Sequence, residues 1–317
     1  MARYLVTGGA GFIGSNITDE LVRRKQEVRV FDDLSSGSKD NLKAVMNDIE
    51  FIEGDIRDAA LLKKALKGCD YVIHQGALRS VPKSMTNPVL YDEVNVMGTL
   101  NVLSAAAENK VKRVVFASSS SVYGDSERLP QSEDQMPQPV SPYAATKLAG
   151  EHYCRVFAKS YGLETVALRY FNVFGPRQSL ESEYAVVIPK FITCILRGEQ
   201  PPVHGDGKQS RDFTYVDNVV DANLTAATRE GISGEVFNVA CGKGYNLLDL
   251  IRIINDITGK DVQPKFEASR PGDVKHTLSD ITKMKKLLKL DPKVDFVQGL
   301  RKTVEYFSAM RAPGGRQ

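Results

Sequence analysis

Short apolar runs alternate along the first half of the chain with longer segments whose apolar residues recur at helical spacing. Between the runs, this spacing predicts helices near Ile13–Arg24, Ala59–Leu66, Asn95–Asn109 and Tyr143–Tyr161. The apolar runs predict strands at Tyr4–Thr7, Val28–Phe31, Phe51–Glu53, Tyr71–His74, Val114–Ser118 and Thr165–Arg169. Strands that alternate with helices in this way indicate an α/β fold with a doubly wound parallel sheet.

The alternation loosens after Phe174, where prolines and glycines separate shorter elements. Helical spacing returns at Asp217–Thr228, Leu247–Thr258 and Phe296–Met310. We therefore expect a sheet domain over residues 1–175 and a smaller mixed α/β lobe over residues 176–311. The last residues, 312–317, are expected to fray.

The chain has 317 residues and a composition typical of a globular protein, with 42% hydrophobic and 26% charged residues. Its 42 Lys and Arg against 39 Asp and Glu leave a net charge of only +3. Because nucleic-acid-binding proteins usually carry a strongly basic balance, no nucleic acid partner is expected.

The four cysteines lie far apart without a Cys-x-x-Cys pair, which suits a reducing compartment and argues against disulfides and a zinc site. The four histidines show no metal-ligand spacing, so no metal is expected. No apolar signal core opens the chain, and no run approaches ~18 apolar residues. These features favour a cytoplasmic protein without a membrane partner.

A glycine-rich segment, Thr7–Gly14, follows the first expected strand and opens the first expected helix. Gly8, Gly11 and Gly14 stand where a chain must turn tightly, approach a pyrophosphate and pack helix on strand, and the backbone N–H groups at the helix start suit an anion. Glycines also mark ordinary turns, but this position favours a Rossmann-type dinucleotide-binding domain.

The identity of the dinucleotide depends on Asp32, at the end of the second expected strand. A carboxylate there accepts hydrogen bonds from both ribose hydroxyls and repels a 2′-phosphate, so the sequence favours NAD over NADP. The alternative is that Asp32 and Asp33 are solvated turn residues. Asp55 and Ile56, after the third strand, are candidate contacts of the adenine, although Gly-Asp after a strand is also a common turn.

Tyr143 and Lys147 lie one turn apart on the same face of an expected helix. A phenol, with a reference pKa of ~10, is a poor base at neutral pH, but an adjacent ammonium group favours the phenolate and lowers that pKa. Ser119, just after an expected strand, can offer a hydroxyl to the same substrate oxygen. Such pairs are also frequent on exposed helices, so only the combination with Ser119 and the glycine loop indicates catalysis.

At this point the chain resembles the extended short-chain dehydrogenase/reductase family and, within it, the NAD-dependent nucleotide-sugar 4-epimerases. The resemblance covers essentially residues 3–308. It rests on Thr7–Gly14, Asp32, Gly54–Ile56, Ser118–Gly124, Tyr143 with Lys147, Arg169–Pro176, Arg211–Phe213 and Arg270–Asp273.

The resemblance implies a reaction through a 4-keto sugar. Tyr143 takes the proton from the sugar 4-hydroxyl, Ser119 hydrogen-bonds the reacting oxygen, and Lys147 holds the nicotinamide ribose. The hydride passes to NAD and returns to the other face of the sugar. Further cofactor contacts implied by the match are Phe12, Ile13, Gln75, Arg79, Asn95 and Tyr170.

The resemblance also implies that the C-terminal lobe grips the nucleotide. Arg211 and Arg270 would clamp the diphosphate with planar, charge-assisted hydrogen bonds, and Asp273 would accept from the uridine ribose. Without the resemblance, both arginines would be interpreted as surface charges. The other implied substrate contacts are Ser119, Ser121, Asn172, Val187, Lys190, Phe191, His204 and Thr277, with Lys190 and Phe191 covering the uracil.

The same family contains 4,6-dehydratases, decarboxylases and uronate epimerases, and the alternatives stay open. A dehydratase carries Thr-Asp-Glu where this chain has Ser119-Ser120-Ser121, so it would lack its acid and base here. Thr277 stands where epimerases restricted to unmodified hexoses tend to carry Tyr, which leaves room for a 2-acetamido group. The sequence therefore favours a 4-epimerase of UDP-Glc/UDP-Gal and of UDP-GlcNAc/UDP-GalNAc.

Two further expectations come from the resemblance. A non-catalytic NAD-binding sensor of this fold typically loses the Tyr or the Lys of the catalytic pair, and this chain keeps both. The helices around Asn95–Asn109 and Tyr143–Tyr161 resemble those that the family pairs into a four-helix bundle, so a homodimer is expected.

Overall fold

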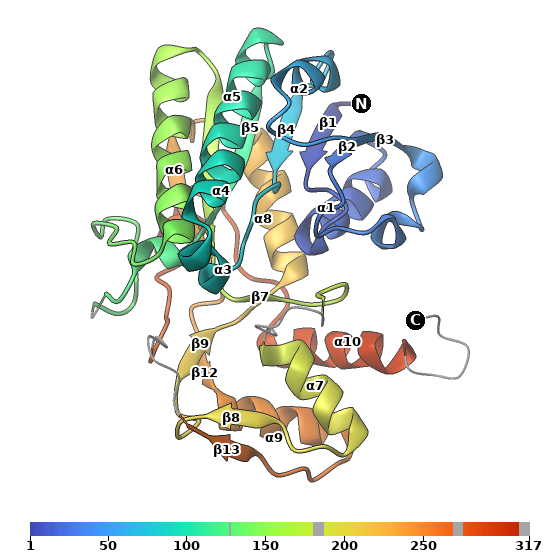
Figure 1. Cartoon of the computed structure of the whole chain (residues 1–317), viewed down its shortest axis with the longest axis vertical. Helices are drawn as coiled ribbons and strands as arrows, with labels where there is room; N and C mark the ends of the chain where they lie inside the picture. Colours follow the sequence, from blue (N-terminus) through green and yellow to red (C-terminus); the bar gives the residue numbers. More distant parts are fainter. Residues whose placement is uncertain (127, 180–186, 269–274, 311–317) are drawn as a thin grey trace.

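The computed structural model describes residues 1–126, 128–179, 187–268 and 275–310. Its centre is a seven-stranded parallel sheet with the strand order β11-β6-β5-β4-β1-β2-β3 (Figure 1). The strands are β1 (Arg3–Thr7), β2 (Glu27–Asp32), β3 (Ile49–Glu53), β4 (Tyr71–His74), β5 (Arg113–Ser119), β6 (Glu164–Tyr170) and β11 (Glu235–Val239). All six strands expected from the sequence are present, and the predicted Rossmann-type α/β fold is confirmed.

Helices cover both faces of this sheet. On one face lie α1 (Phe12–Arg23) and α8 (Val216–Thr228). The other face carries α2 (Ala59–Ala65), α5 (Gly98–Glu108) and α6 (Pro142–Ser160), and the short helices α3 (Val81–Thr86) and α4 (Pro88–Asp92) pack on α6. A single π-helical turn, Glu93–Met97, leads into α5.

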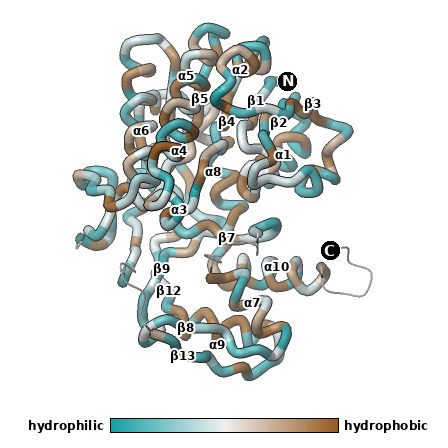
Figure 2. Tube along the Cα trace, viewed as in Figure 1, coloured by the Kyte–Doolittle hydropathy of each residue, from teal (hydrophilic) through white to brown (hydrophobic). Residues whose placement is uncertain are grey.

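Adjacent apolar residues on the strands serve opposite faces of the sheet. Leu5, Val72 and Val114 are fully buried beneath α2, α5 and α6. Their neighbours Val6, Ile73 and Val115 are fully buried in the core that includes α1 and α8. A sheet covered on both faces needs such continuous apolar runs, which is why the sequence shows the strands as uninterrupted stretches. Figure 2 shows largely hydrophilic loops around these brown interior segments.

The seventh strand, β11, was not expected. It pairs parallel with β6 at the edge of the sheet, although β6 ends at Tyr170 and β11 begins only at Glu235. Because α8 also packs on β4, β5 and β6, the chain returns to the sheet domain after residue 175. Two elements inside the range 176–311, α8 and β11, therefore pack in the larger layer.

The smaller lobe lies below the sheet domain in Figure 1. It contains α7 (Val187–Arg197), α9 (Leu247–Thr258) and α10 (Phe296–Ala309), together with β8 (Pro202–His204), β9 (Ser210–Asp212), β12 (Gly244–Asn246) and β13 (Lys265–Glu267). These strands form the pairs β9–β12 and β8–β13, and β7 (Val173–Phe174) pairs with β10 (Thr214–Tyr215) at the junction with the sheet domain. In the described part of the chain, no helix is long and apolar enough to cross a membrane.

Pro189 is one of the prolines after Phe174 that were expected to separate elements, but it lies inside helix α7. Pro189 is the third residue of α7. Proline is tolerated in the first turn of a helix, because the N–H groups there have no intrahelical partner to lose. The expected termini of the other three helices of this region hold to within one residue.

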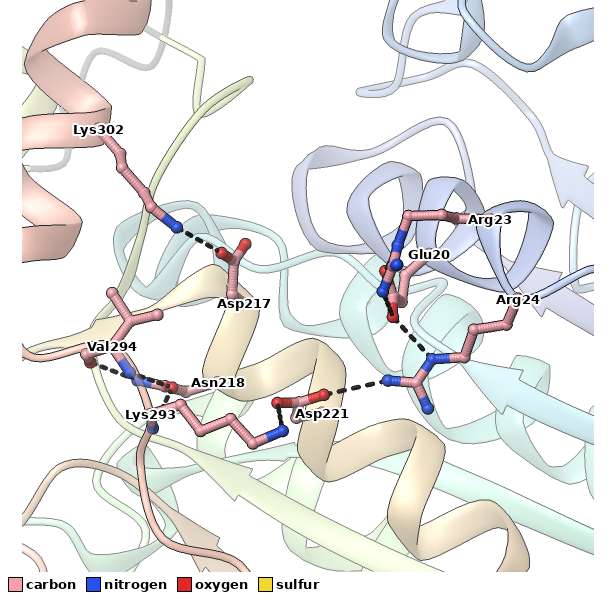
Figure 3. Close-up of polar contacts among 9 residues, drawn as sticks. All are labelled: Glu20, Arg23, Arg24, Asp217, Asn218, Asp221, Lys293, Val294 and Lys302. Carbon is pink, nitrogen blue, oxygen red and sulfur yellow. Dashed lines mark hydrogen bonds and ion pairs between the residues drawn. The ribbon is translucent and has the colours of Figure 1, made fainter.

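Polar contacts on one side of α8 tie the two lobes together (Figure 3). Asp221 pairs with Arg24, the residue that follows α1, at 3.2 Å and with Lys293 at 2.8 Å. The buried amide of Asn218 donates to the carbonyl of Val294 at 2.8 Å and accepts from the N–H groups of Lys293 and Val294 at 3.0 and 3.1 Å. Asn218 therefore satisfies three backbone groups in the segment that leads into α10.

Replacing Asn218 by Ala should lower the free energy of unfolding by about 2 kcal/mol, because two N–H groups and a carbonyl lose their partner. The control is Asp217→Ala on the same helix, where a half-exposed carboxylate loses only its ion pair with Lys302. That variant should change stability by at most ~0.5 kcal/mol. Urea unfolding of both variants measures the difference, and equal losses would contradict this account of the junction.

Candidate active site

The carboxyl ends of β1, β2, β4, β5 and β6 surround a cleft of about 550 Å³. Open α/β sheets bind ligands at this edge. The cleft brings together fifteen of the residues expected from the sequence, which are Gly8, Gly11, Phe12, Ile13, Gly14, Asp32, Ile56, Gln75, Arg79, Ser119, Ser121, Tyr143, Lys147, Tyr170 and Asn172.

The glycine loop needs its glycines for close packing. Gly8 has a φ of +64°, and a Cβ there would lie 2.7 Å from the backbone nitrogen of Gly76. A Cβ at Gly14 would lie 2.1 Å from the carbonyl oxygen of Gly8. Gly11, the N-cap of α1, has no side chain to cap the helix, so the first N–H groups of α1 are available to an anion. This cradle fits the pyrophosphate of a dinucleotide.

Asp32 is fixed where β2 ends. Its carboxylate accepts from the N–H of Ala10 at 2.9 Å and from the N–H of Leu34 at 2.8 Å. Burial raises the pKa of Asp32, and the two N–H groups oppose that shift. The side chain lines the cleft next to the glycine loop. This placement fits recognition of a ribose whose 2′-hydroxyl carries no phosphate.

Two expected cofactor contacts do not line the cleft. Asp55 pairs with Arg57 at 2.6 Å, which holds the pKa of Asp55 low, whereas its neighbour Ile56 does line the cleft. Asn95 is buried in the π-helical turn and binds both the N–H and the carbonyl of Leu78, at 2.8 and 3.0 Å. Each side chain thus contacts a residue that does line the cleft, Arg57 and Leu78 respectively.

Tyr143 and Lys147 project from the first two turns of α6, whose N-terminus is capped by Ser141. The Nζ atom of Lys147 donates to the carbonyl of Ala117 in β5 at 2.8 Å and lies 5.1 Å from the ring centre of Phe116. Ser119 ends the same strand and hydrogen-bonds the phenol of Tyr143. The three catalytic candidates thus meet where α6 crosses the end of β5.

The surroundings of the Tyr143 phenol act on its ionisation in opposite directions. Burial raises the pKa of Tyr143, while the hydrogen bond with Ser119 and the charge of Arg79 lower it. The ammonium group of Lys147 donates to the carbonyl of Ala117. Arg79 is the cation whose charge lowers the pKa of the phenol in this structure.

The hydrogen-bonded group beside the glycine loop includes a residue that the sequence did not reveal. Gln75 donates to the phenol of Tyr170 at 2.9 Å and to Asn223 of α8 at 3.2 Å, and Tyr170 donates to Asn223 at 3.0 Å. Asn223 is fully buried. In the sequence, Asn223 stands out only as a polar residue on the apolar face of an expected helix. That pattern does not indicate a ligand.

The C-terminal lobe meets the cleft at Asn172. The side chain of Asn172 donates to the carbonyl of Asp212 at 3.1 Å and to the hydroxyl of Thr277 at 3.2 Å. The neighbouring Arg211, in β9, donates to the carbonyl of Ser210 at 3.0 Å. Thr277 therefore lies one contact away from a residue that lines the cleft.

The remaining predicted substrate contacts lie apart from the cleft lining. His204, in β8, contacts the carbonyl of Ala268 at 3.2 Å, and Val187 and Lys190 are half-buried on α7. Phe191 is only 1% exposed and packs in the hydrophobic core. Arg270 and Asp273 lie outside the described residues.

Among the residues that the structure describes, no group of three or more His, Cys, Asp or Glu side chains could hold a metal ion. Of the four histidines, His74 is the most buried. Burial lowers its pKa to about 3, and its ring contacts the hydroxyls of Thr7 and Thr99 at 2.6 and 3.1 Å. It is a neutral link between β1 and α5.

Comparisons with known proteins agree with this geometry. Residues 4–240 match the model of the NAD dependent epimerase/dehydratase family. The solved UDP-N-acetylglucosamine 4-epimerase of Methanobrevibacter ruminantium M1, in complex with UDP-N-acetylmuramic acid, is 44% identical, with a TM-score of 0.93 over 98% of this chain and 99% of that one.

Two curated relatives show the range of reactions among similar proteins. The UDP-glucose 4-epimerase of Mycolicibacterium smegmatis is 39% identical over 96% of this chain and 98% of its own. The UDP-N-acetyl-alpha-D-glucosaminuronate decarboxylase of Bacillus cytotoxicus is 34% identical over 96% of this chain and 97% of its own.

The protonation of Lys147 makes a testable contribution to stability. Burial lowers the pKa of Lys147 from 10.5 to about 8. Between pH 8 and 10.5 the unfolded chain therefore binds more protons than the folded protein, so stability rises with pH across this window. Below pH 8 the folded protein carries the full cost of a buried ammonium group.

Replacing Lys147 by Met should raise the free energy of unfolding by about 2 kcal/mol at pH 7, after allowance for the lost hydrogen bond to Ala117. The gain should shrink as the pH approaches 10.5. Urea unfolding at pH 7 and pH 9.5 measures both values. Lys159→Met, at an exposed position in the last turn of α6, is the matched control. A loss of stability at pH 7, or a gain that does not change with pH, would contradict this account.

Proposed function

The chain belongs to the NAD dependent epimerase/dehydratase family, and we propose that it is a 4-epimerase of UDP-hexoses. Its substrates would be UDP-GlcNAc and UDP-GalNAc as well as UDP-Glc and UDP-Gal. The observation that carries the reaction is the meeting of Tyr143, Ser119 and Lys147 in one cleft with the glycine loop and Asp32. The observation that carries the substrate is Thr277 beside Asn172.

The side chains of this cleft can handle one proton. Tyr143 accepts the proton of the sugar 4-hydroxyl, and Ser119 hydrogen-bonds the same oxygen as its charge develops. Arg79 favours the ionised phenol. Lys147 places a positive charge on the floor of the cleft, where the nicotinamide ribose would lie. Bound NAD supplies the hydride chemistry that no side chain can perform.

A 4-epimerase must hold its nucleotide firmly while the sugar turns. The proposed grip on the nucleotide comes from the C-terminal lobe, with Asn172 and Arg211 on the diphosphate and Val187, Lys190 and His204 towards the base. Arg270 and Asp273 are proposed to complete it. A binding site divided in this way fixes the nucleotide and leaves the hexose with few polar partners.

The acid groups of the cleft support epimerisation over elimination. Among the described residues that line the cleft, the only carboxylates are Asp32 and Asp33, at the end of β2. Ser120 and Ser121 occupy the positions that follow Ser119. A 4,6-dehydration needs an acid and a base at C5 and C6 of the sugar, and these serines supply neither.

A uronate substrate is the second candidate, and one observation favours it. Arg79 lines the cleft and is close enough to influence the ionisation of Tyr143. A guanidinium group at that place can pair with the carboxylate of a UDP-uronate. UDP-uronate epimerisation and decarboxylation are therefore included in the test below.

Incubation of the purified protein with UDP-GlcNAc, UDP-Glc and UDP-GlcA, without added cofactor, tests the proposal directly. We expect UDP-GalNAc and UDP-Gal as products, resolved by chromatography, and no change in UDP-GlcA. Conversion of UDP-GlcA alone would replace the proposed substrate by a uronate. Loss of water or CO₂ from any substrate would overturn the assignment as an epimerase.

The size argument has its own test in Thr277→Tyr. The phenol would fill the space next to Asn172, so turnover of UDP-GlcNAc should fall at least about 100-fold while UDP-Glc keeps its rate within ~3-fold. Thr277→Ser, which keeps the hydroxyl that Asn172 contacts, is the control and should retain both activities. If UDP-GlcNAc is inert for the unmodified protein, the size argument fails.

We also propose a homodimer formed through α5 and α6. Several large apolar side chains beside these helices are exposed, including Met85, Val89, Met97 and Val156, at 60%, 69%, 54% and 46%. Patches of this kind mark association surfaces. Light scattering should give twice the chain mass of 34.9 kDa. Met97→Glu together with Val156→Glu should yield a monomer, whereas Met136→Glu, on the loop that precedes α6, should not. A monomeric unmodified protein would refute the dimer.

A further inference from the structure

Glu151 continues the row of functional residues along α6. Tyr143, Lys147 and Glu151 follow one another at intervals of four, so they lie on one face of the helix. Glu151 is turned into the protein between α6 and the sheet, and only 4% of its side chain is exposed. The proposed reaction gives this carboxylate no role.

The contacts of Glu151 lie at the ends of two strands. Its Oε1 atom accepts from the hydroxyl of Ser118 in β5 at 2.5 Å. The guanidinium group of Arg169 in β6 donates to both carboxylate oxygens, at 2.8 and 2.7 Å. Two strands and one helix therefore meet at a single buried carboxylate.

The sheet register places these contacts directly behind the cleft. Ser118 is the register partner of Arg169, and the next pair along the two strands is Ser119 with Tyr170. Both members of that next pair line the cleft. Any displacement of Ser118 would therefore move Ser119, because consecutive residues of a strand share a peptide plane.

Stability does not explain why the ion pair is retained. A buried ion pair contributes little net stability, since the desolvation of both charges offsets their attraction. Here the satisfaction is incomplete: Nη1 of Arg169 is buried without a hydrogen-bond partner among the described residues. The guanidinium carbon lies 4.7 Å from the ring centre of Tyr123, which partly compensates for the burial.

The position of Ser119 is also constrained by its own hydrogen bonds. Its Oγ atom donates to the hydroxyl of Ser121 at 3.0 Å and accepts from the N–H of Ser121 at 3.2 Å. The same hydroxyl contacts Tyr143. One small group thus serves three partners, and the backbone that carries it has little freedom to adjust.

We propose that Glu151, held by Arg169, is a positioning residue that acts through Ser118 to set the hydrogen bond between Ser119 and Tyr143. Three residues of α6 then contact three consecutive residues of β5. Tyr143 meets Ser119, Lys147 meets Ala117, and Glu151 meets Ser118. The inference rests on the proposed function only in taking Tyr143 as the reacting group.

The first test compares two hydroxyl deletions at the same interface of helix and sheet. Ser118→Ala removes the contact with Glu151. The matched control, Thr165→Val, removes a buried hydroxyl of β6 that donates to the carbonyl of Cys154 in α6 at 2.7 Å, away from the cleft. Both variants lose one buried hydrogen bond between α6 and the sheet, so thermal unfolding should report similar losses of stability.

The readout that separates the variants is the ionisation of Tyr143 in the NAD-loaded protein, followed by tyrosinate absorbance, with Tyr143→Phe as the blank. Ser118→Ala should raise the pKa of Tyr143 by about one pH unit, because the hydrogen bond that lowers it is misplaced. It should also lower kcat about 10-fold while KM stays within ~2-fold. Thr165→Val should match the unmodified protein in all three values.

The titration needs no sugar nucleotide, so its result stands whether or not the proposed substrates are turned over. An unchanged pKa of Tyr143 in Ser118→Ala, or an equal shift in Thr165→Val, would overturn the inference. The same two results are decisive even if both variants lose stability, because each is compared with the other.

A second variant tests Glu151 and Arg169 directly and leaves the hydroxyl of Ser118 in place. Glu151→Leu combined with Arg169→Met replaces the ion pair by apolar side chains, a change that buried pairs often tolerate. The double variant should fold with an unchanged or higher melting temperature and still show the raised pKa of Tyr143 and the lower kcat. A stable double variant with normal ionisation and turnover would refute the positioning role.

Discussion

The cleft depends on the seating of one helix on the end of one strand. Helix α6 presents Tyr143, Lys147 and Glu151 at intervals of four residues. Each of them contacts one of the last three residues of β5, which are Ser119, Ala117 and Ser118 respectively. The helix is fixed there by its buried contacts with β5 and β6, which are both interior strands of the sheet. Because a parallel sheet brings the carboxyl ends of its strands to one edge, the glycine loop and Asp32 reach the same cleft without any further device.

This seating has an energetic cost. An ammonium group, a phenol that must ionise and an ion pair are all withdrawn from water within a few residues of each other, and burial opposes the charged forms of Lys147 and Tyr143. The hydrophobic layers on both faces of the sheet, which include fully buried residues such as Leu5 and Val115, supply the stability against which this cost is set. The apolar faces of the sheet therefore stabilise the fold, while the groups proposed to react lie at the carboxyl end of its strands.

Much of the fold follows from local patterns, and the errors have a common origin. The strands up to β6 were predictable because their apolar runs alternate with segments of helical spacing. The strand β11 was not, because its pairing with β6 joins residues far apart in sequence. Similarly, the spacing of Tyr143 and Lys147 predicts a shared helix face but not the direction of an ammonium group, which the carbonyl of Ala117 decides. Arg79, Asn223 and Glu151 lie outside any local pattern, since their roles come from the register of strands and the seating of helices.

In the proposed mechanism, Tyr143 moves the proton and other residues hold NAD. Comparison of the unmodified protein with Tyr143→Phe tests this most directly, because the change removes a single oxygen. We predict that turnover of UDP-GlcNAc and UDP-Glc falls at least about 100-fold while the affinity for NAD changes less than ~3-fold. Turnover within a few-fold of the unmodified protein would contradict the account.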